Sequence, residues 1–446
     1  MNSDVLAMER RAPRGLPIAV DEQAASPPLR NRVITWALVV PLLFYAVSGV
    51  VRFDSSFKNN TLSSNFQSPQ ETDVRTRILN LGVTLECAVL ALSRWKSVKT
   101  LLVANRALVA LWALAFISVA WSVSPHPTLT YSSYLAVNTL FAAFLITRFD
   151  KQEQMQLMML IGWLATFLSI AAAILVPAYG VDHRGVHSNG DWMGIYIHKN
   201  SCAVVTTYLL SAAFFYQVKG IYARMYRAIY ICGSVFLLIM TQARTGWLAF
   251  AVLASFAFCY KLYSKISRRE RILLVLIVVA VAVTAAIVLA NNYVAVLQGL
   301  GKDATLTGRT EIFTAVFNAI LKHSFTGYGY FAYFSSPDNY ETSLQSGVRG
   351  LLPTVDNGYL GLWLDLGIVG LLLFSATLLR AFYDAYICLK RGRHVGWYIS
   401  ILILAVVTNT AERMFMLPNY LAWILYMMAC LGLRQEVLQS RDQEAA

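Results

Sequence analysis

Three arginines in this chain lie beside glycine and hydroxyl or polar residues, a combination suited to holding an anionic group. Glycine lets backbone approach a ligand closely, and guanidinium offers a planar fork of donors that matches phosphate oxygens. His198, Lys199 and Asn200 add further polar groups near the first arginine. The three segments are DHRGVHSNGDWMGIYIHKN (182–200, with Arg184), TQARTGW (241–247, with Arg244) and LGKDATLTGRTEIF (300–313, with Arg309). The pattern indicates binding of a phosphate-like anion.

A carboxylate stands at the threshold of a long apolar run in VDNGYLGLWLDLGIVG, residues 355–370. Asp356 and Asn357 are both residue types that cap helix N-termini. Asp356 also suits a general base, because a carboxylate is ionised at neutral pH and accepts a proton. The two roles are compatible, so we expect Asp356 both to cap the following helix and to face a substrate.

Each arginine also has a purely structural interpretation. Arg244 lies in a tight connection between two apolar runs, where it either extends toward lipid phosphate or faces a polar cavity. Arg309 lies in a TGRT turn that could simply precede a helix beginning near Glu311. His183 and His187 are four residues apart, but the residues between them do not look helical and no carboxylate pair completes a ligand set, so we predict no metal and no cofactor.

The elements that position these residues are membrane helices. Of the 446 residues, 57% are hydrophobic and 14% are charged, against roughly 25% charged in ordinary soluble domains. The apolar runs are continuous rather than alternating, which argues against a β-barrel. The sequence predicts an all-α fold, a polytopic bundle of about 12 transmembrane helices. Hydropathy and length place them at 33–51, 78–93, 101–122, 129–146, 155–177, 198–217, 228–243, 247–262, 272–290, 358–378, 395–410 and 417–433.

The net charge of +13 comes mainly from short loops between apolar runs, which is typical of membrane orientation signals rather than nucleic-acid binding. This distribution predicts cytoplasmic termini, with residues 1–32 and 434–446 as tails. The transmembrane body is 33–433, and it includes a large periplasmic loop at 291–357. A loop of that length suggests a lid or a site-forming subdomain. The aromatic residues of this loop could stack on sugar faces, but we favour a position at the membrane interface. They are Tyr328, Tyr330, Phe331, Tyr333 and Phe334.

An ordered set of motifs between about residues 115 and 415 resembles the O-antigen ligase and polysaccharide polymerase superfamily, and most closely its ExoQ-type exopolysaccharide polymerases. Each motif is short, but their order and spacing are specific together. They are WSVSP (121–125), GIYIHKN (194–200), TQARTGW, LGKDATLTGRTEIF, TGYGY (326–330), DNGYLGLWLDLGIVGLLLF (356–374) and TNTAER (408–413).

The resemblance implies a glycosyltransferase of the bacterial inner membrane that acts on undecaprenyl-diphosphate-linked oligosaccharides at the periplasmic face. By motif, Arg244 and Arg309 would bind the diphosphate and Asp356 would stand at the position of the base. Many relatives have His-Asn where this chain has Asp356-Asn357, which leaves His198 or His323 as alternative bases. The substrate-binding set would be Arg184, His198, Lys199, Asn200 and Asn357.

Three functions remain open on this basis. The first is a polymerase that joins lipid-linked repeat units into an exopolysaccharide, and the second is a ligase that moves a finished glycan onto a lipid A core or a protein. The third is a transporter of an anionic solute, for which mid-membrane charges and broken helices would be expected. The expected partners are the lipid bilayer, the lipid-linked oligosaccharide, and a flippase and chain-length regulator of the same pathway.

Overall fold

The computed structural model describes residues 29–47, 74–183, 190–263, 265–267, 270, 309–336, 339, 342–343 and 354–445. The chain divides into Met1–Val39 and Val40–Ala446, and the packing below concerns the second part. Within it, the described residues are almost entirely helical, which confirms the predicted all-α class.

The helices follow the predicted apolar runs closely, because each run is long enough to satisfy its own backbone hydrogen bonds away from water. The predicted span 272–290 lies outside the described residues. The helices are α1 Leu29–Ala46, α2 Val74–Ser93, α3 Trp95–Val103, α4 Arg106–Ile117, α5 Pro125–Arg148, α6 Lys151–Leu175, α7 Pro177–Gly180, α8 Lys199–Phe215, α9 Ile221–Met240, α10 Arg244–Tyr263, α13 Arg309–Lys322, α15 Gly358–Lys390, α16 Gly396–Thr408 and α17 Leu421–Ala445.

Three short elements complete the described structure. Two are the 3-10 turns η2 (Ser118–Ala120) and η3 (Tyr333–Ser335). The third is a small antiparallel ladder in which β1 (Val181–Asp182) pairs with β2 (Asp191–Trp192). This ladder leads into α8 and so fixes the chain just before His198.

The predicted count of about twelve membrane crossings is not confirmed by the part of the chain that the structure describes. Among the described residues, six helices are long and apolar enough to cross a membrane, and a seventh arises if α2 and α3 count as one bent span. The difference has a physical reason, since α2 and α3 meet at 90° and α4 and α16 are shorter apolar helices. The count of twelve is therefore not confirmed, although the membrane bundle itself is.

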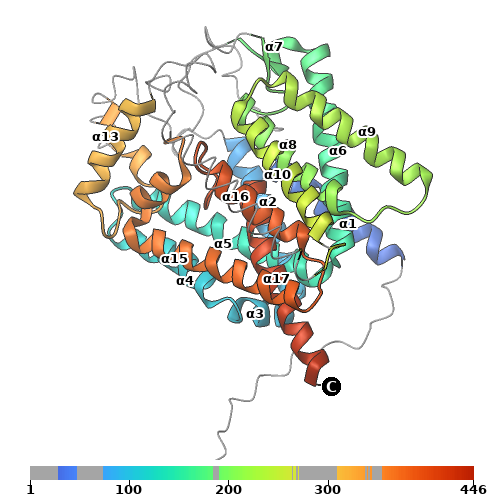
Figure 1. Cartoon of the computed structure of the whole chain (residues 1–446). Coiled ribbons are helices and arrows are strands. Elements are labelled where there is room, and N and C mark those ends of the chain that lie inside the picture. The colour runs from blue at the N-terminus through green and yellow to red at the C-terminus, as the bar shows by residue number, and fades with distance from the viewer. Residues whose placement is uncertain are drawn as a thin grey trace, which may run out of the picture. The chain divides into compact units, whose positions relative to one another are not determined.

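An inner group of helices carries the bundle. The apolar window of α17 is 78% buried, whereas those of α9 and α10 are 22% buried and so lie at the periphery. α17 packs against α5, α15 and α16, and α8 packs against α6, α10 and α16 (Figure 1). The long helix α15 also contacts α4 and α13. α15 thus connects the inner bundle with the loop segments that precede it.

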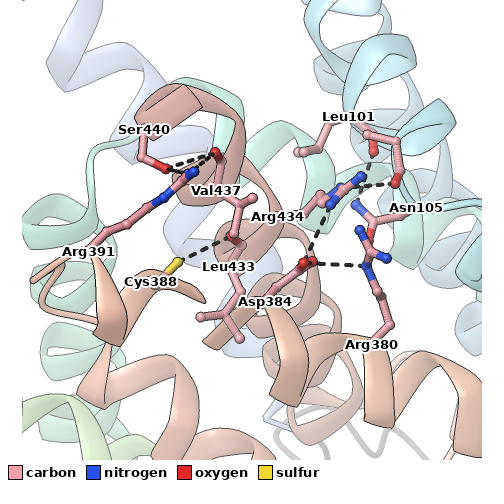
Figure 2. Close-up of polar contacts among 11 residues, drawn as sticks. Leu101, Asn105, Arg380, Asp384, Cys388, Arg391, Leu433, Arg434, Val437 and Ser440 are labelled. Carbon is pink, nitrogen blue, oxygen red and sulfur yellow. Dashed lines mark hydrogen bonds and ion pairs between the residues drawn. The ribbon is translucent and has the colours of Figure 1, made fainter. Parts of the chain in front are cut away.

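A buried charge cluster ties the far end of α15 to α17 and to the α3–α4 turn (Figure 2). The Asp384 carboxylate is fully buried and accepts Arg380 Nε at 3.3 Å and Arg434 Nη1 at 3.4 Å. Arg434 Nε also donates to the Ala104 carbonyl at 3.1 Å. A buried carboxylate is costly unless it is paired, so this cluster favours one register of α17 against α15.

Candidate functional site

The helix α15 is interrupted at Gly367, and a loop segment fills the break. Gly367 has φ +64°, which ends one helical segment and starts another. The backbone groups freed by the break pair with the segment 324–329, which includes the first four residues of the motif TGYGY (326–330). The bonds run from Tyr328 N to Leu364 O (3.0 Å), from Gly329 N to Asp365 O (2.9 Å) and from Ile368 N to Ser324 O (2.9 Å). This loop is therefore bonded to α15 by its main chain.

Glycine is required on both sides of this contact. A Cβ on Gly367 would lie 2.1 Å from the Phe325 carbonyl oxygen, and one on Gly327 would lie 2.4 Å from the Asp365 carbonyl oxygen. Both residues also have positive φ, which L side chains rarely adopt. The glycines of TGYGY and of the LDLG sequence thus have a direct steric explanation.

The WSVSP motif packs against the same loop. Trp121 Nε1 donates to the Thr326 carbonyl at 3.1 Å, and Val123 N donates to the Tyr328 carbonyl at 3.0 Å. A Cβ on Gly329 would lie 2.6 Å from Ser122 Cβ. Two motifs about 200 residues apart in the sequence therefore form one main-chain assembly.

A buried ion pair holds the TNTAER motif to α15. Arg413 Nη2 donates to Asp365 Oδ2, and both side chains are at most 5% exposed. The guanidinium also lies over the Phe331 ring, 4.2 Å from its centroid. Tyr330 donates its hydroxyl to the Met416 carbonyl; burial, followed by the nearby Asp365 charge, raises the Tyr330 pKa well above its usual value. Tyr330 is therefore a permanent donor in this assembly.

The loop aromatics are interior residues, so their predicted interfacial position is wrong. Tyr328, Tyr330, Phe331 and Tyr333 are each at most 9% exposed, and Phe334 is half-buried. Tyr328 and Tyr333 belong to a core that also contains residues of α13 and α15. These rings stabilise the loop from within instead of forming a belt in the lipid.

Asn357, not Asp356, caps α15. Asn357 Oδ1 accepts hydrogen bonds from Tyr359 N and Leu360 N, both at 3.0 Å, and its Nδ2 donates to the Thr410 carbonyl at 3.2 Å. The prediction that Asp356 caps the helix is wrong, because the helix begins at Gly358 and the capping position falls on the residue directly before it. Asp356 lies one residue earlier, half-buried, beside the positive end of the α15 dipole.

Asn357 bonds to the segment 409–415, and the Asn409 side chain holds that segment in its conformation. Asn409 Oδ1 accepts from Met414 N and Phe415 N, both at 2.8 Å, and its carbonyl accepts from Gly358 N at 2.8 Å. A Cβ on Gly358 would lie 2.1 Å from Asn409 Oδ1. The start of α15 and the 409–415 segment are therefore fixed to each other.

The start of α8 reaches the same segment. Asn200 Nδ2 donates to the buried Glu412 carboxylate, while His198 Nδ1 caps α8 by accepting from Asn200 N at 3.2 Å. Lys199 forms an ion pair with Asp191 of β2. Thus, among the predicted binding residues, Asn200 and Asn357 both contact residues 410–412, and Lys199 already has an anionic partner.

Arg244 stands apart from these contacts. It is the first residue of α10, after a tight turn in which Gln242 has φ +52° and Trp247 Nε1 returns to the Leu238 carbonyl at 2.8 Å. Its side chain is exposed, and it makes no hydrogen bond or ion pair with any residue that the structure describes. A Cβ on Gly246 would lie 2.3 Å from Ala203 Cβ of α8, so close packing of α10 on α8 sets where Arg244 emerges.

The remaining predicted arginines are placed incompletely. Arg309 is the first residue of α13, but its side chain lies outside the described part, as do all of Arg184 and the residues up to 189. Sequence reasoning missed Asn409, Glu412 and Arg413 as organisers of the site. The available signal was the occurrence of five polar side chains in TNTAER between two apolar runs.

Fold and site together define a multi-pass membrane protein with polar residues gathered where its helices begin. Residues 229–375, about a third of the chain, match the Wzy_C family, described as O-antigen ligase, and this match supports the resemblance to the O-antigen ligase and polysaccharide polymerase superfamily. The matched region runs from α9 into α15 and contains Arg244, Arg309 and Asp356. It supports glycosyl transfer at a membrane as the general activity. No curated protein matches the chain.

Proposed function

We propose that the protein polymerises undecaprenyl-diphosphate-linked oligosaccharide repeat units into an exopolysaccharide at the periplasmic face of the bacterial inner membrane. The observation that carries the proposal is that four of the motifs on which the resemblance rests are assembled around the first half of α15, within and beside the region that matches the O-antigen ligase family. Hydrogen bonds join the motifs WSVSP, TGYGY, DNGYLGLWLDLGIVGLLLF and TNTAER there.

Binding of the donor rests on the arginines. The leaving diphosphate gains negative charge as the glycosidic bond breaks, and fixed cations at a low-dielectric boundary stabilise that charge with little reorganisation. Arg244 suits this role because its side chain is exposed and unpaired among the described residues. Arg309, at the positive N-terminus of α13, and Arg184 would complete the anion site.

Asp356 is the proposed base. The acceptor hydroxyl gives its proton to the carboxylate, its oxygen bonds to the anomeric carbon of the donor, and the bond from that carbon to the diphosphate oxygen breaks. The lipid diphosphate then leaves with the bonding electron pair. Asp356 suits this step because it carries a carboxylate at the start of α15, directly before the capping residue Asn357.

His198, Lys199, Asn200 and Asn357 form the proposed sugar- and diphosphate-binding edge. Asn200 and Asn357 share the 410–412 segment and so act from one rigid platform. Lys199 would have to exchange Asp191 for substrate, which makes it a weaker anion ligand than Arg244. The flippase and the chain-length regulator remain proposed partners in the same membrane.

One observation favours a transporter as the second candidate. α15 is a broken helix with a charged pair beside the break, as in many transporters. In this protein, however, the break is filled by the main chain of residues 324–329 and Asp365 is neutralised by Arg413. The charge of Asp365 is thus paired within the protein, and we favour transfer over transport.

The test is an assay with purified protein in proteoliposomes, which enclose a compartment, and the lipid-linked repeat unit of its own organism. A ladder of repeats with no other acceptor would establish polymerisation. Product formed only after a lipid A core or a protein acceptor is added would make the protein a ligase. Uptake of the lipid-linked unit or of an anionic solute without new glycosidic bonds would overturn the transferase proposal.

A further inference from the structure

The helix α13 has one buried face and one exposed face, and the exposed face is itself divided. Its buried residues, Ala315, Val316, Ala319 and Ile320, are each at most 4% exposed. Toward the outside, Phe317, Leu321 and the following Phe325 are 41%, 57% and 68% exposed. At about 100° per residue, Phe317 and Leu321 lie within ~40° of each other on the helix.

Polar residues occupy a separate strip of the exposed face. Glu311, Asn318 and Lys322 are exposed, and they lie roughly 100–140° around the helix from Phe317. An outward face split into an apolar and a polar strip is typical of helices that lie in a membrane interface. A helix wholly surrounded by water would rarely expose three large apolar side chains together, because such patches mark interaction or membrane sites.

The contact between α13 and α15 indicates how deep α13 lies relative to the membrane, independently of the exposed apolar strip. The part of α15 after Gly367 runs from residue 368 to 390, which at 1.5 Å per residue is about 34 Å. That length alone crosses a hydrocarbon core of about 30 Å, so the break at Gly367 falls near one membrane boundary. The end of α13 is bonded to that break, since Ile368 N donates to the Ser324 carbonyl.

An indole lies at the same level. Trp363 Nε1 donates to the Ser324 carbonyl at 3.0 Å, and the Trp363 ring contacts Phe317 with centroids 6.0 Å apart. Tryptophan is enriched at membrane interfaces, where its ring is in the apolar layer and its N–H finds a partner. Phe317 is therefore next to a residue type that is typical of this depth.

We infer that α13 is an interfacial helix whose strip of Phe317, Leu321 and Phe325 is inserted into the bilayer at the end where α15 begins. The partner is the lipid surface itself. The inference stands independently of the glycosyl-transfer proposal, because it rests on the exposed strip and the depth of the α15 break. Its consequence is that the bilayer fixes the height of α13 and hence of Arg309 at its first residue.

The test uses nitroxide labels on the full-length protein in phospholipid nanodiscs. Cys232 and Cys259 are replaced by alanine, since the other four cysteines are buried, and the unlabelled background is checked. Single labels are placed at Leu321→Cys and, as a matched control on the same turn, at Asn318→Cys. We expect the label at 321 to collide preferentially with oxygen, which partitions into lipid, and the label at 318 with a water-soluble nickel chelate.

Two results would overturn the inference. Equal access of the nickel chelate at both positions would put the strip in water. Low access of both reagents at 321 would mean that protein, not lipid, covers it. A second test introduces Leu321→Glu or Asn318→Glu and measures nickel access at a label on Phe325→Cys in monodisperse protein. Glutamate at 321 should raise nickel access at 325 several-fold, whereas glutamate at 318 should leave it unchanged.

Discussion

At the residue scale, Arg244 is an exposed guanidinium at the start of α10 that no described side chain neutralises. Replacing it with alanine should reduce glycosyl transfer by about 10²-fold or more, because fixed charges at a leaving group contribute on that order. The apparent melting temperature should be unchanged, since no described contact is lost. Turnover is measured as repeat units formed per protein and stability by thermal unfolding in detergent.

The control for Arg244 is Lys219→Ala, which removes another exposed cation from the loop between α8 and α9. Equal losses in the two variants would indicate a general electrostatic effect rather than a diphosphate contact. Wild-type turnover in Arg244→Ala would remove this residue from the proposed site.

Substitutions of the neighbours Asp356 and Asn357 should have different effects, the first on turnover and the second on stability. Asp356→Asn should lower turnover by about 10²-fold with little change in melting temperature. Asn357→Ala should cost about 1 kcal/mol of stability, because it removes the side chain that caps α15. Both variants are compared in the same two assays. A large melting shift in Asp356→Asn with proportionate loss of activity would make Asp356 a structural residue.

The sequence located this pair but assigned the cap to the wrong member. Asp and Asn are both good capping residues, and helix boundaries are uncertain by one or two residues from sequence. A shift of one position was enough to exchange the two roles. What placed the cap on Asn357 is the tertiary contact between Gly358 N and the Asn409 carbonyl, which no local pattern contains.

At the element scale, the break in α15 should depend on glycine. Gly367→Ala should destabilise the protein by more than about 1 kcal/mol, because alanine disfavours positive φ and its Cβ would meet the Phe325 carbonyl. Gly82→Ala in α2 is the matched control, since nothing lies within 4 Å of its Cβ position. Thermal unfolding of the two variants measures the difference. An equal or smaller shift for Gly367→Ala would mean that the loop can separate from α15 without cost.

Helix positions were predictable because long apolar runs in lipid have one main solution. The break at Gly367 was not, since LWLDLGIVGLLL is apolar throughout apart from Asp365. Its cause is a partner segment about 40 residues earlier in the chain. The buried loop aromatics were misplaced for a related reason: a tyrosine-rich stretch near a membrane has the same composition whether it faces lipid or its own loop.

At the scale of the whole molecule, the Asp384 cluster connects three distant parts of the chain. Asp384→Leu should destabilise the protein by about 3–5 kcal/mol, because it leaves Arg434 without its buried counter-ion. Arg380→Ala should cost less than about 1 kcal/mol, since the Arg380 side chain is 44% exposed. The melting temperatures of the two variants test this order. The reverse order would mean that the cluster is not what holds α17 to α15.

The number of crossings is also a property of the whole molecule, and it was the least predictable one. Hydropathy treats each apolar run separately, whereas α2 and α3 meet at 90° and α4 and α16 are short. The distribution of basic residues among the loops predicts the orientation of the chain in the membrane. It does not predict how many residues of each apolar run are helical.

The main-chain bonds between residues 324–329 and α15 also bear on how the protein is made. The segment that satisfies Leu364 and Asp365 precedes α15 in the chain, so it leaves the ribosome first. It can complete the broken helix only after it has reached the correct side of the membrane. We therefore expect α15 to insert in two steps, in which the stretch from residue 368 onward enters lipid first and residues 358–366 fold once they have paired with the earlier loop.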